Sequence, residues 1–163
     1  MKKAMKIASF VLLALIICLG ILLTYVKTAL PNVGEPEVIS IEHTPARLER
    51  GTYLANHVYV CVDCHSKRDW TKFSGPLVEG TIGMGGETFD QRYGFPGKFY
   101  SRNISPAGIG TWTDGELLRA ISTGVSKSGR ALFPVMPHVD IVWKNGRRRS
   151  EGYFCLFKNR KAG

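Results

Sequence analysis

Two thiols and an imidazole stand within five consecutive residues, Cys61-Val62-Asp63-Cys64-His65. This C-x-x-C-H spacing is the signature for covalent attachment of a c-type haem. On one helical turn, both thiols can add to the two vinyl groups of a single porphyrin, and the adjacent histidine can bind the iron as the proximal ligand. The sequence therefore predicts one covalent haem c, with thioether bonds to Cys61 and Cys64 and with His65 as an axial ligand.

A C-x-x-C pair alone is less specific, because redox dithiols and half of a zinc site share it. A structural zinc site needs a second pair of ligands, and the two remaining cysteines, Cys18 and Cys155, are single. A thioredoxin-like dithiol is expected in a βαβ setting, and the chain shows no such pattern. Zinc and a dithiol stay open as minor alternatives to haem.

The second axial ligand is expected from Met136, which lies 71 residues beyond His65 between two prolines. Proline disfavours a helix and favours a rigid loop, which would present the thioether sulfur to the iron. A methionine ligand raises the reduction potential, as suits a carrier of single electrons. Met84, on a glycine-flanked loop, and His138 are the alternative ligands, and an open site on the iron is the remaining alternative. A methionine that only fills the core is the plain structural interpretation.

Two helices and one long stretch of loops are expected to position these ligands. Thr44-Pro45 is typical of an N-cap followed by proline in the first turn, so a helix is predicted from there towards the cysteine pair. The capping box Thr113–Glu116 predicts a second helix, which ends at Gly124. Between the helices, residues 66–112 are rich in glycine and aromatic side chains. We expect these loops to enclose a flat apolar cofactor.

The N-terminus has the pattern of a membrane segment. Residues 1–6 form a short basic start, and residues 7–26 carry no charge and consist mainly of leucine and isoleucine. Such a run can span about 30 Å of hydrocarbon as a helix, with the basic start on the cytoplasmic side. Residues 27–43 are predicted to be a linker. We expect a retained single-pass anchor in a bacterial cytoplasmic membrane, with the following domain on the periplasmic side; a cleaved signal is the alternative.

The net charge of +9 is concentrated in the two flanks of the chain. Residues 1–27 hold four lysines and no acidic residue, and residues 142–163 hold seven basic residues and one acidic residue. Residues 28–141 hold eleven basic and twelve acidic residues, so the central body is close to neutral. A nucleic-acid-binding module needs a basic face on its folded body, and the charge pattern therefore excludes that class.

Several short segments match one family. Besides the Cys61–His65 motif, they are Asn103-Ile104-Ser105-Pro106, Gly108-Ile109-Gly110-Thr111-Trp112-Thr113-Asp114, Arg119-Ala120-Ile121, Thr123-Gly124-Val125 and Leu132 to Pro137. The chain resembles class I c-type cytochromes, and more specifically membrane-anchored bacterial cytochromes related to the cytochrome subunits of periplasmic alcohol and aldehyde dehydrogenases. The resemblance covers roughly Arg47 to Pro137. It implies a small all-α haem fold, His65 and Met136 as axial ligands, and electron transfer with redox partners outside the membrane.

The resemblance ends near residue 141. Such cytochromes close with an amphipathic helix after the methionine loop, whereas residues 142–163 show no capped helical face. One choice of codons for this stretch, read one nucleotide later, encodes Y-G-K-M-D-E-E-E-V-K-G-I-F-A-Y-L-K-T-V-K-P, which has an Asp cap and an aromatic helix. The sequence therefore predicts a frameshift product from about residue 142 and loss of the C-terminal helix. A basic tail that binds a partner or lipid headgroups is the alternative.

The chain is predicted to begin with a cytoplasmic start (1–6), a membrane anchor (7–26) and a linker (27–43). A monohaem cytochrome c domain (44–141) and an aberrant basic tail (142–163) are predicted to follow. The predicted function is to carry single electrons between a dehydrogenase or quinol-oxidising complex and a terminal oxidase. No catalytic triad or carboxylate pair stands out, so we expect an electron carrier or electron-transfer subunit rather than an enzyme. The alternatives are a thiol-disulfide oxidoreductase using Cys61 and Cys64, and a haem peroxidase or sensor with a displaceable ligand.

Overall fold

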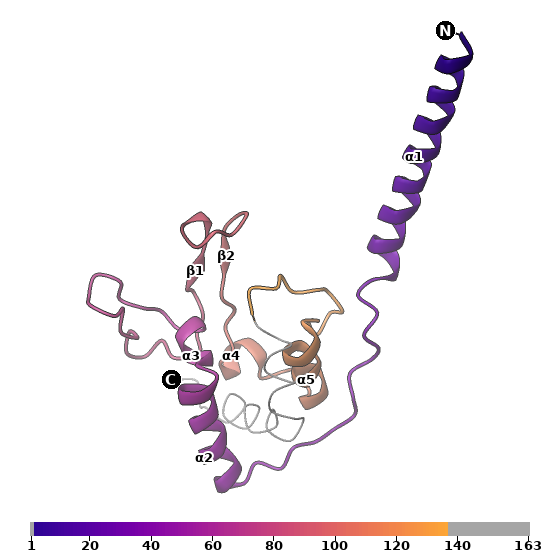
Figure 1. Ribbon diagram of the computed structural model, residues 1–163. Coiled ribbons are helices and arrows are strands. Elements are labelled where there is room, and N and C mark those ends of the chain that lie inside the picture. The colour runs from indigo at the N-terminus through magenta and orange to yellow at the C-terminus, as the bar shows by residue number, and fades with distance from the viewer. Residues whose placement is uncertain (1, 137–163) are drawn as a thin grey trace.

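The computed structural model describes residues 2–136 (Figure 1). Short helices and long loops make up most of the body, which follows one long N-terminal helix. In chain order the elements are α1 (Lys2–Ala29), α2 (Pro45–Tyr53), the π-helix η1 (Leu54–Val58), α3 (Cys61–Cys64), β1 (Thr88–Phe89), the 3-10 helix η2 (Gln91–Tyr93), β2 (Phe99–Tyr100), α4 (Pro106–Ile109) and α5 (Asp114–Thr123).

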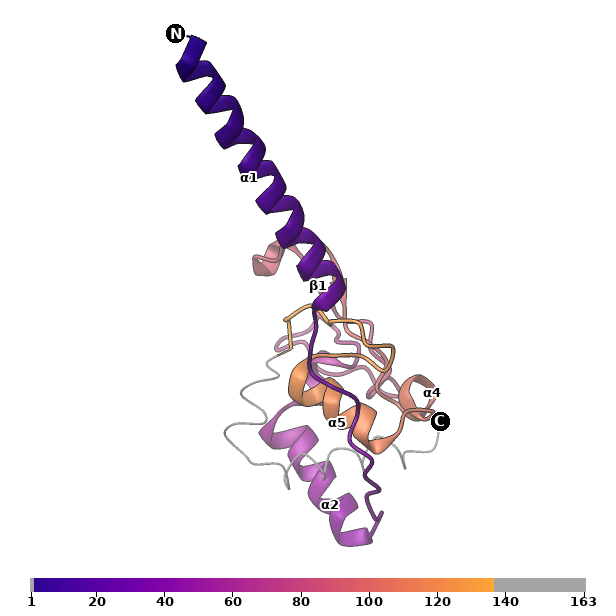
Figure 2. The same cartoon turned by 90° about the vertical axis from the view of Figure 1, so that its right-hand side faces the viewer.

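Helix α1 is long and apolar enough to cross a membrane. None of its residues is buried, and Figures 1 and 2 show it projecting away from the other elements. The predicted apolar span, residues 7–26, lies within this helix. The presence of one N-terminal apolar helix is therefore confirmed, and its length and composition suit a membrane anchor and a secretory signal alike.

Helix α2 begins as its sequence predicts and then widens. The Thr44 hydroxyl oxygen accepts a hydrogen bond from the Arg47 amide at 3.3 Å, and Pro45 occupies the first turn. From Leu54 to Val58 the chain continues as a π-helix, and Val60 then takes a left-handed conformation with φ of 47°. A positive φ is rare for a β-branched residue, and short π-helical segments are frequent at functional sites. The single predicted helix is thus divided immediately before the cysteine pair.

Helix α5 matches its prediction at both ends. The Thr113 hydroxyl accepts from the Glu116 amide at 3.2 Å, and the Thr113 amide donates to the Glu116 carboxylate at 2.7 Å. Gly124 ends the helix in the left-handed region with φ of 70°. Both the capping box and the terminal glycine are therefore confirmed, because these signals depend on local chemistry alone.

Two small clusters of apolar side chains lie between the helices. The first consists of Leu54 and Ala55, against which Tyr59, Cys61, Ile104, Ile109, Ile121 and Met136 pack. The second consists of Ile41, Leu117 and Leu118, against which Ile39, Leu48, Ile109, Trp112 and Ile121 pack. Ile109 and Ile121 contact both clusters. They connect α2 and η1 to α4 and α5.

Part of the predicted linker packs against α5. The Ile41 amide donates to a buried Asp114 carboxylate oxygen at 2.8 Å, and Arg119 donates to the Gly34 carbonyl at 3.2 Å. A Cβ on Gly115 would overlap the Glu37 carbonyl oxygen. The stretch from Gly34 to Ile41 therefore lies on the body as a strap, and the predicted linker of residues 27–43 includes packed structure.

Most of the regular secondary structure in residues 2–136 is helical, as predicted, but these residues also include a two-stranded antiparallel sheet. Strand β1 pairs with β2, with Thr88 opposite Tyr100 and Phe89 opposite Phe99. The all-α prediction is therefore correct only in part. These strands are two residues long and are flanked by glycine and proline turns, so their sequence carries no alternating pattern. The predicted aberrant tail, 142–163, and the predicted loss of the C-terminal helix lie outside the described residues.

Candidate haem-attachment site

The two cysteines stand at the ends of the single turn α3. The His65 amide donates to the Cys61 carbonyl at 3.0 Å, and the Asp63 amide donates to the Val60 carbonyl at 2.9 Å. Val62 is 3% exposed, so the turn is fixed from inside the body. Cys61 is half-buried, Cys64 is exposed, and both are free thiols. The turn thus carries two thiols, followed directly by an imidazole.

The His65 ring is oriented by one hydrogen bond. Its Nδ1 lies 2.7 Å from the Arg102 carbonyl oxygen, which can only accept, so Nδ1 carries the proton and Nε2 keeps its lone pair. Burial lowers the pKa of His65, because the charged imidazolium loses its water. The neutral ring is the form that binds a metal. A histidine that binds a metal through one ring nitrogen is commonly oriented by a hydrogen bond from the other ring nitrogen, as Nδ1 makes here.

Backbone hydrogen bonds join His65 to the Gly83–Gly86 loop, and this loop to the segment after β2. The Gly85 amide donates to the His65 carbonyl at 2.8 Å, and the Ile104 amide donates to the Gly83 carbonyl at 2.8 Å. The fully buried Ser66 hydroxyl accepts from the Gly83 amide at 3.0 Å. The glycine-rich stretch beginning at Gly83 is therefore fixed between the histidine and the segment that follows β2.

The Asn103 side chain stabilises the turn at Ser105, directly before α4. Its side-chain oxygen accepts from the Ser105 amide at 2.8 Å and from the Ser105 hydroxyl at 2.7 Å. A Cβ on Gly108 would overlap the Asn103 carbonyl oxygen, so only glycine allows this close approach. The role of the Asn103–Pro106 segment is thus positional. Arg102, whose carbonyl orients His65, was not predicted, because a backbone carbonyl gives no side-chain signal in a sequence.

Of the predicted second ligands, Met136 shares an apolar cluster with the first cysteine of the motif. Met136 and Cys61 are both half-buried and pack against the Leu54–Ala55 cluster. Met84 is 49% exposed and belongs to neither cluster. His138 lies outside the described residues. The described residues therefore bring Cys61 and Met136 to one apolar cluster and leave Met84 at the surface.

The thiols are not those of a reactive dithiol. Burial raises the pKa of Cys61 to about 12. The pKa of Cys64 is also raised, first by burial and then by the charge of Asp63. A nucleophilic cysteine needs a lowered pKa, because the thiolate is the attacking species. Within residues 2–136, moreover, no three His, Cys, Asp or Glu side chains gather as metal ligands. The raised pKa values disfavour the dithiol alternative, and the described residues offer no zinc site.

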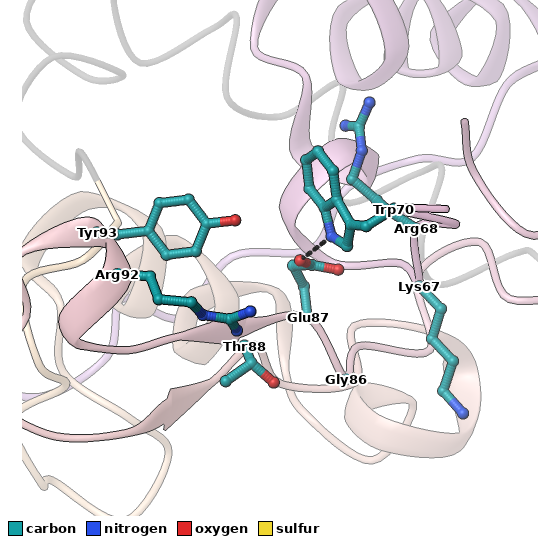
Figure 3. A pocket seen from close by; sticks show the side chains of 8 residues that line it. All are labelled: Lys67, Arg68, Trp70, Gly86, Glu87, Thr88, Arg92 and Tyr93. Carbon is teal, nitrogen blue, oxygen red and sulfur yellow. Dashed lines mark hydrogen bonds between the residues drawn. The ribbon is translucent and has the colours of Figure 1, made fainter. Parts of the chain in front are cut away.

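A pocket of about 470 Å³ is lined by charged, polar and aromatic side chains, the first of which, Lys67, stands two residues after His65 (Figure 3). Its lining residues are Lys67, Arg68, Trp70, Gly86, Glu87, Thr88, Arg92 and Tyr93. The Trp70 indole donates to the Glu87 carboxylate at 2.7 Å, and Arg68 lies 5.3 Å over the Trp70 ring and 3.5 Å from Asp63. These charged groups do not suit an apolar macrocycle. Trp70, one of the aromatic residues expected to enclose the cofactor, therefore belongs to this polar pocket.

The donor set fits a haem. Two free thiols one turn apart match two vinyl groups, the His65 Nε2 is free to bind iron, and a thioether shares an apolar cluster with the first thiol. Cys61, Cys64, His65 and Met136 are therefore the residues that could hold the group.

Comparison with known proteins gives three informative relatives. The chain is 35% identical over 96 residues to the gluconate 2-dehydrogenase cytochrome c subunit of Pantoea cypripedii, a match that covers 57% of the chain and 19% of the relative. It is 31% identical over 97 residues to the alcohol dehydrogenase (quinone) cytochrome c subunit of Gluconacetobacter polyoxogenes, with 57% and 18% covered. It is 34% identical over 96 residues to a nicotinate dehydrogenase subunit of Pseudomonas putida, with 57% and 7% covered.

These matches span less than one fifth of each relative's length, and no family model matches the chain. Two of the three relatives are named as cytochrome c subunits of dehydrogenases. The resemblance predicted from the motifs is thereby confirmed: over about 57% of its length, the chain resembles the cytochrome c subunits of bacterial dehydrogenases.

Proposed function

We propose that this chain is a c-type cytochrome that carries single electrons through one covalently bound haem c. The observation that carries the proposal is the C-x-x-C-H motif on a single helical turn, with the His65 Nδ1 hydrogen-bonded to the Arg102 carbonyl. This arrangement prepares two thiols and one imidazole nitrogen for the same cofactor. The similarity to cytochrome c subunits of dehydrogenases supports the same conclusion.

The haem, when bound, supplies an iron that accepts and releases one electron. Cys61 and Cys64 would hold the macrocycle through thioether bonds, and His65 would bind the iron through Nε2, in the orientation set by the Arg102 carbonyl. Met136 would supply a thioether ligand, which favours the ferrous state. The buried Leu54 and Ala55 provide an apolar surface beside Cys61 and Met136. Burial of His65 separately lowers the pKa of its imidazole and so favours the neutral ring.

The redox partner that we propose is a dehydrogenase, because the similar proteins are named as subunits of gluconate, alcohol and nicotinate dehydrogenases. A quinol-oxidising complex or terminal oxidase would take part at the other end of the transfer. Helix α1 would tether the domain to the bacterial cytoplasmic membrane on its periplasmic side. In this role the chain is an electron-transfer subunit, and substrate chemistry takes place in its partner.

Mass spectrometry of the full chain from a host that matures c-type cytochromes tests this proposal. The expected mass is that of the polypeptide plus one haem, and a pyridine haemochrome spectrum should give one haem c per chain. A bare polypeptide mass would overturn the proposal. Carbon monoxide should leave the reduced spectrum unchanged, because both axial positions are occupied. Rapid binding of carbon monoxide would instead favour a haem sensor or peroxidase.

A further inference from the structure

A row of five aromatic rings connects the β1–β2 hairpin to the loop that carries Met136. The row comprises Tyr93, Phe89, Phe95, Phe99 and Phe133. Its last pair is the closest: the Phe99 and Phe133 rings are stacked, with centroids 4.0 Å apart and planes 15° apart. Phe95 meets the edge of Phe99 at 6.2 Å, and Phe89 meets the edge of Phe95 at 6.0 Å. Phe133 stands three residues before Met136.

The hairpin fixes the position of Phe99. Phe89 and Phe99 are paired across the two strands, and the edge-to-face contacts of Phe95 join both rings. Below the hairpin, the Ser101 amide donates to the Glu87 carbonyl at 2.9 Å. Arg102, which orients His65, is the next residue along the same chain segment. One short stretch of backbone therefore positions the His65 ring and presents the Phe99 ring to the methionine loop.

The methionine loop has few other fixed points. The Leu132 amide donates to the Gly124 carbonyl at 2.7 Å, and Val135 donates within the loop to the Phe133 carbonyl at 2.8 Å. Among residues 2–136, no backbone hydrogen bond joins positions 133–136 to a different element. Within the described residues, the side-chain contacts of this loop include the stack of Phe133 on Phe99 and the packing of Met136 on the Leu54–Ala55 cluster.

We infer that Phe99 and Phe133 are positioning residues for Met136: their stack holds the loop so that the thioether stays at the axial site. This inference rests on the proposed function, in which Met136 is the iron ligand. A stacked aromatic pair contributes enough free energy to change a local equilibrium about two- to tenfold. Loss of the stack therefore increases the fraction of molecules in which the thioether has left the axial site.

Imidazole binding to the oxidised full chain measures this fraction, because imidazole binds only where the methionine has left. In Phe99→Leu and in Phe133→Leu, imidazole should bind about two- to tenfold more tightly than in the parent. The double variant should show no more than the larger single effect, since either change alone removes the pair. Phe73→Leu is the matched control, because Phe73 is 99% exposed; its affinity should equal that of the parent.

The same measurement in a Met136→Ala background separates positioning from general packing. If the rings act through Met136, Phe133→Leu has no further effect on imidazole affinity there. Equal effects in both backgrounds, or affinities within the error of the parent in all three variants, would overturn the inference. The parent protein tests the proposed function separately, through the red charge-transfer band of the iron–methionine bond. Without that band, Met136 ligation fails irrespective of the phenylalanines.

Discussion

The two sides of the candidate haem site are built differently. On the His65 side, backbone hydrogen bonds join the turn α3, the Gly83–Gly86 loop and the segment after β2, and the imidazole itself donates to the Arg102 carbonyl. On the Met136 side, one backbone hydrogen bond among the described residues joins the loop from Leu132 to Met136 to Gly124, and the other contacts there are apolar.

This difference has a physical consequence for the two proposed axial ligands. Hydrogen bonds are directional, so the bond to the Arg102 carbonyl gives the His65 ring one orientation. Ring stacking and apolar packing are less directional, so the methionine loop can shift at low cost. We therefore expect the methionine ligand to exchange first under acid, heat or an added ligand, while His65 stays in place.

The largest expected effect comes from removing both thiols. Cys61→Ala with Cys64→Ala should abolish covalent haem, since no sulfur remains to form a thioether bond. The purified chain should then have the bare polypeptide mass and no haemochrome spectrum. Cys18→Ala is the control, because Cys18 lies in α1 and is exposed, and it should leave the haem content unchanged. Covalent haem on the double variant would contradict the assignment of the motif.

Removal of the methionine sulfur should have the next largest effect. Met136→Ala should keep the covalent haem but lose the iron–methionine band. Its reduction potential should also decrease, because a methionine ligand raises the potential and axial ligands set haem potentials over a range of about 0.8 V. Spectroelectrochemical titration measures both. Met84→Ala is the matched control, because Met84 is 49% exposed, and it should keep the band and the potential. An effect of Met84→Ala instead of Met136→Ala would exchange the two assignments.

The backbone network of the His65 side can be weakened without changing any ligand. Gly108→Ala places a Cβ against the Asn103 carbonyl oxygen and should lower the free energy of unfolding by about 1–3 kcal/mol. Denaturant titration measures this. Ala107→Ser, at the exposed neighbouring position in α4, should change it by less than about 0.5 kcal/mol. Below the unfolding transition, Gly108→Ala should keep its iron–methionine band. Loss of that band would mean that the two sides are coupled.

The predictions that the structure confirms are those with local physical causes. The cap at Thr44, the capping box at Thr113 and the terminal Gly124 depend on side chains within one turn of the helix ends. The C-x-x-C-H motif is equally local, so the sequence alone was enough to predict both cysteines on one turn with His65 directly after them. Local chemistry survives in almost any tertiary setting, and for that reason sequence reasoning reaches it.

Four features have no signal in the local sequence, and sequence reasoning did not predict them. The strap from Gly34 to Ile41 gains its structure from Asp114, more than seventy residues away. The π-helix η1 after Tyr53 has no side-chain signature. The two strands of the hairpin are too short to show an alternating pattern of apolar residues. The orientation of His65 depends on the Arg102 carbonyl, a group that every residue carries. Such features need the fold to be known.

The smallest expected effect concerns α5, whose C-cap residue Gly124 accepts the hydrogen bond from the Leu132 amide of the methionine loop. Thr113→Ala removes the hydroxyl that accepts from the Glu116 amide and should cost about 1 kcal/mol of unfolding free energy. Thr113→Ser keeps the acceptor and is the control. Because the cap forms one end of the helix and the loop follows the other, imidazole affinity should change little in either variant. A large change would show that the loop depends on the whole of α5.

Glu116 gives this cap a pH dependence. The backbone hydrogen bond from Thr113 lowers the pKa of Glu116 below its ordinary value of 4.5. A lowered pKa in the folded state means that the carboxylate stabilises the fold above that ordinary value, and that this contribution is lost as the pH falls through the folded pKa. Glu116→Gln keeps an acceptor for the Thr113 amide but cannot titrate. The difference in unfolding free energy between parent and variant should therefore be largest near neutral pH and should shrink below about pH 4. If this difference in unfolding free energy stayed constant from neutral pH to below about pH 4, the capping box would contribute through its geometry alone. The charge of Glu116 would then have no part in stabilising helix α5, whose C-cap holds the methionine loop.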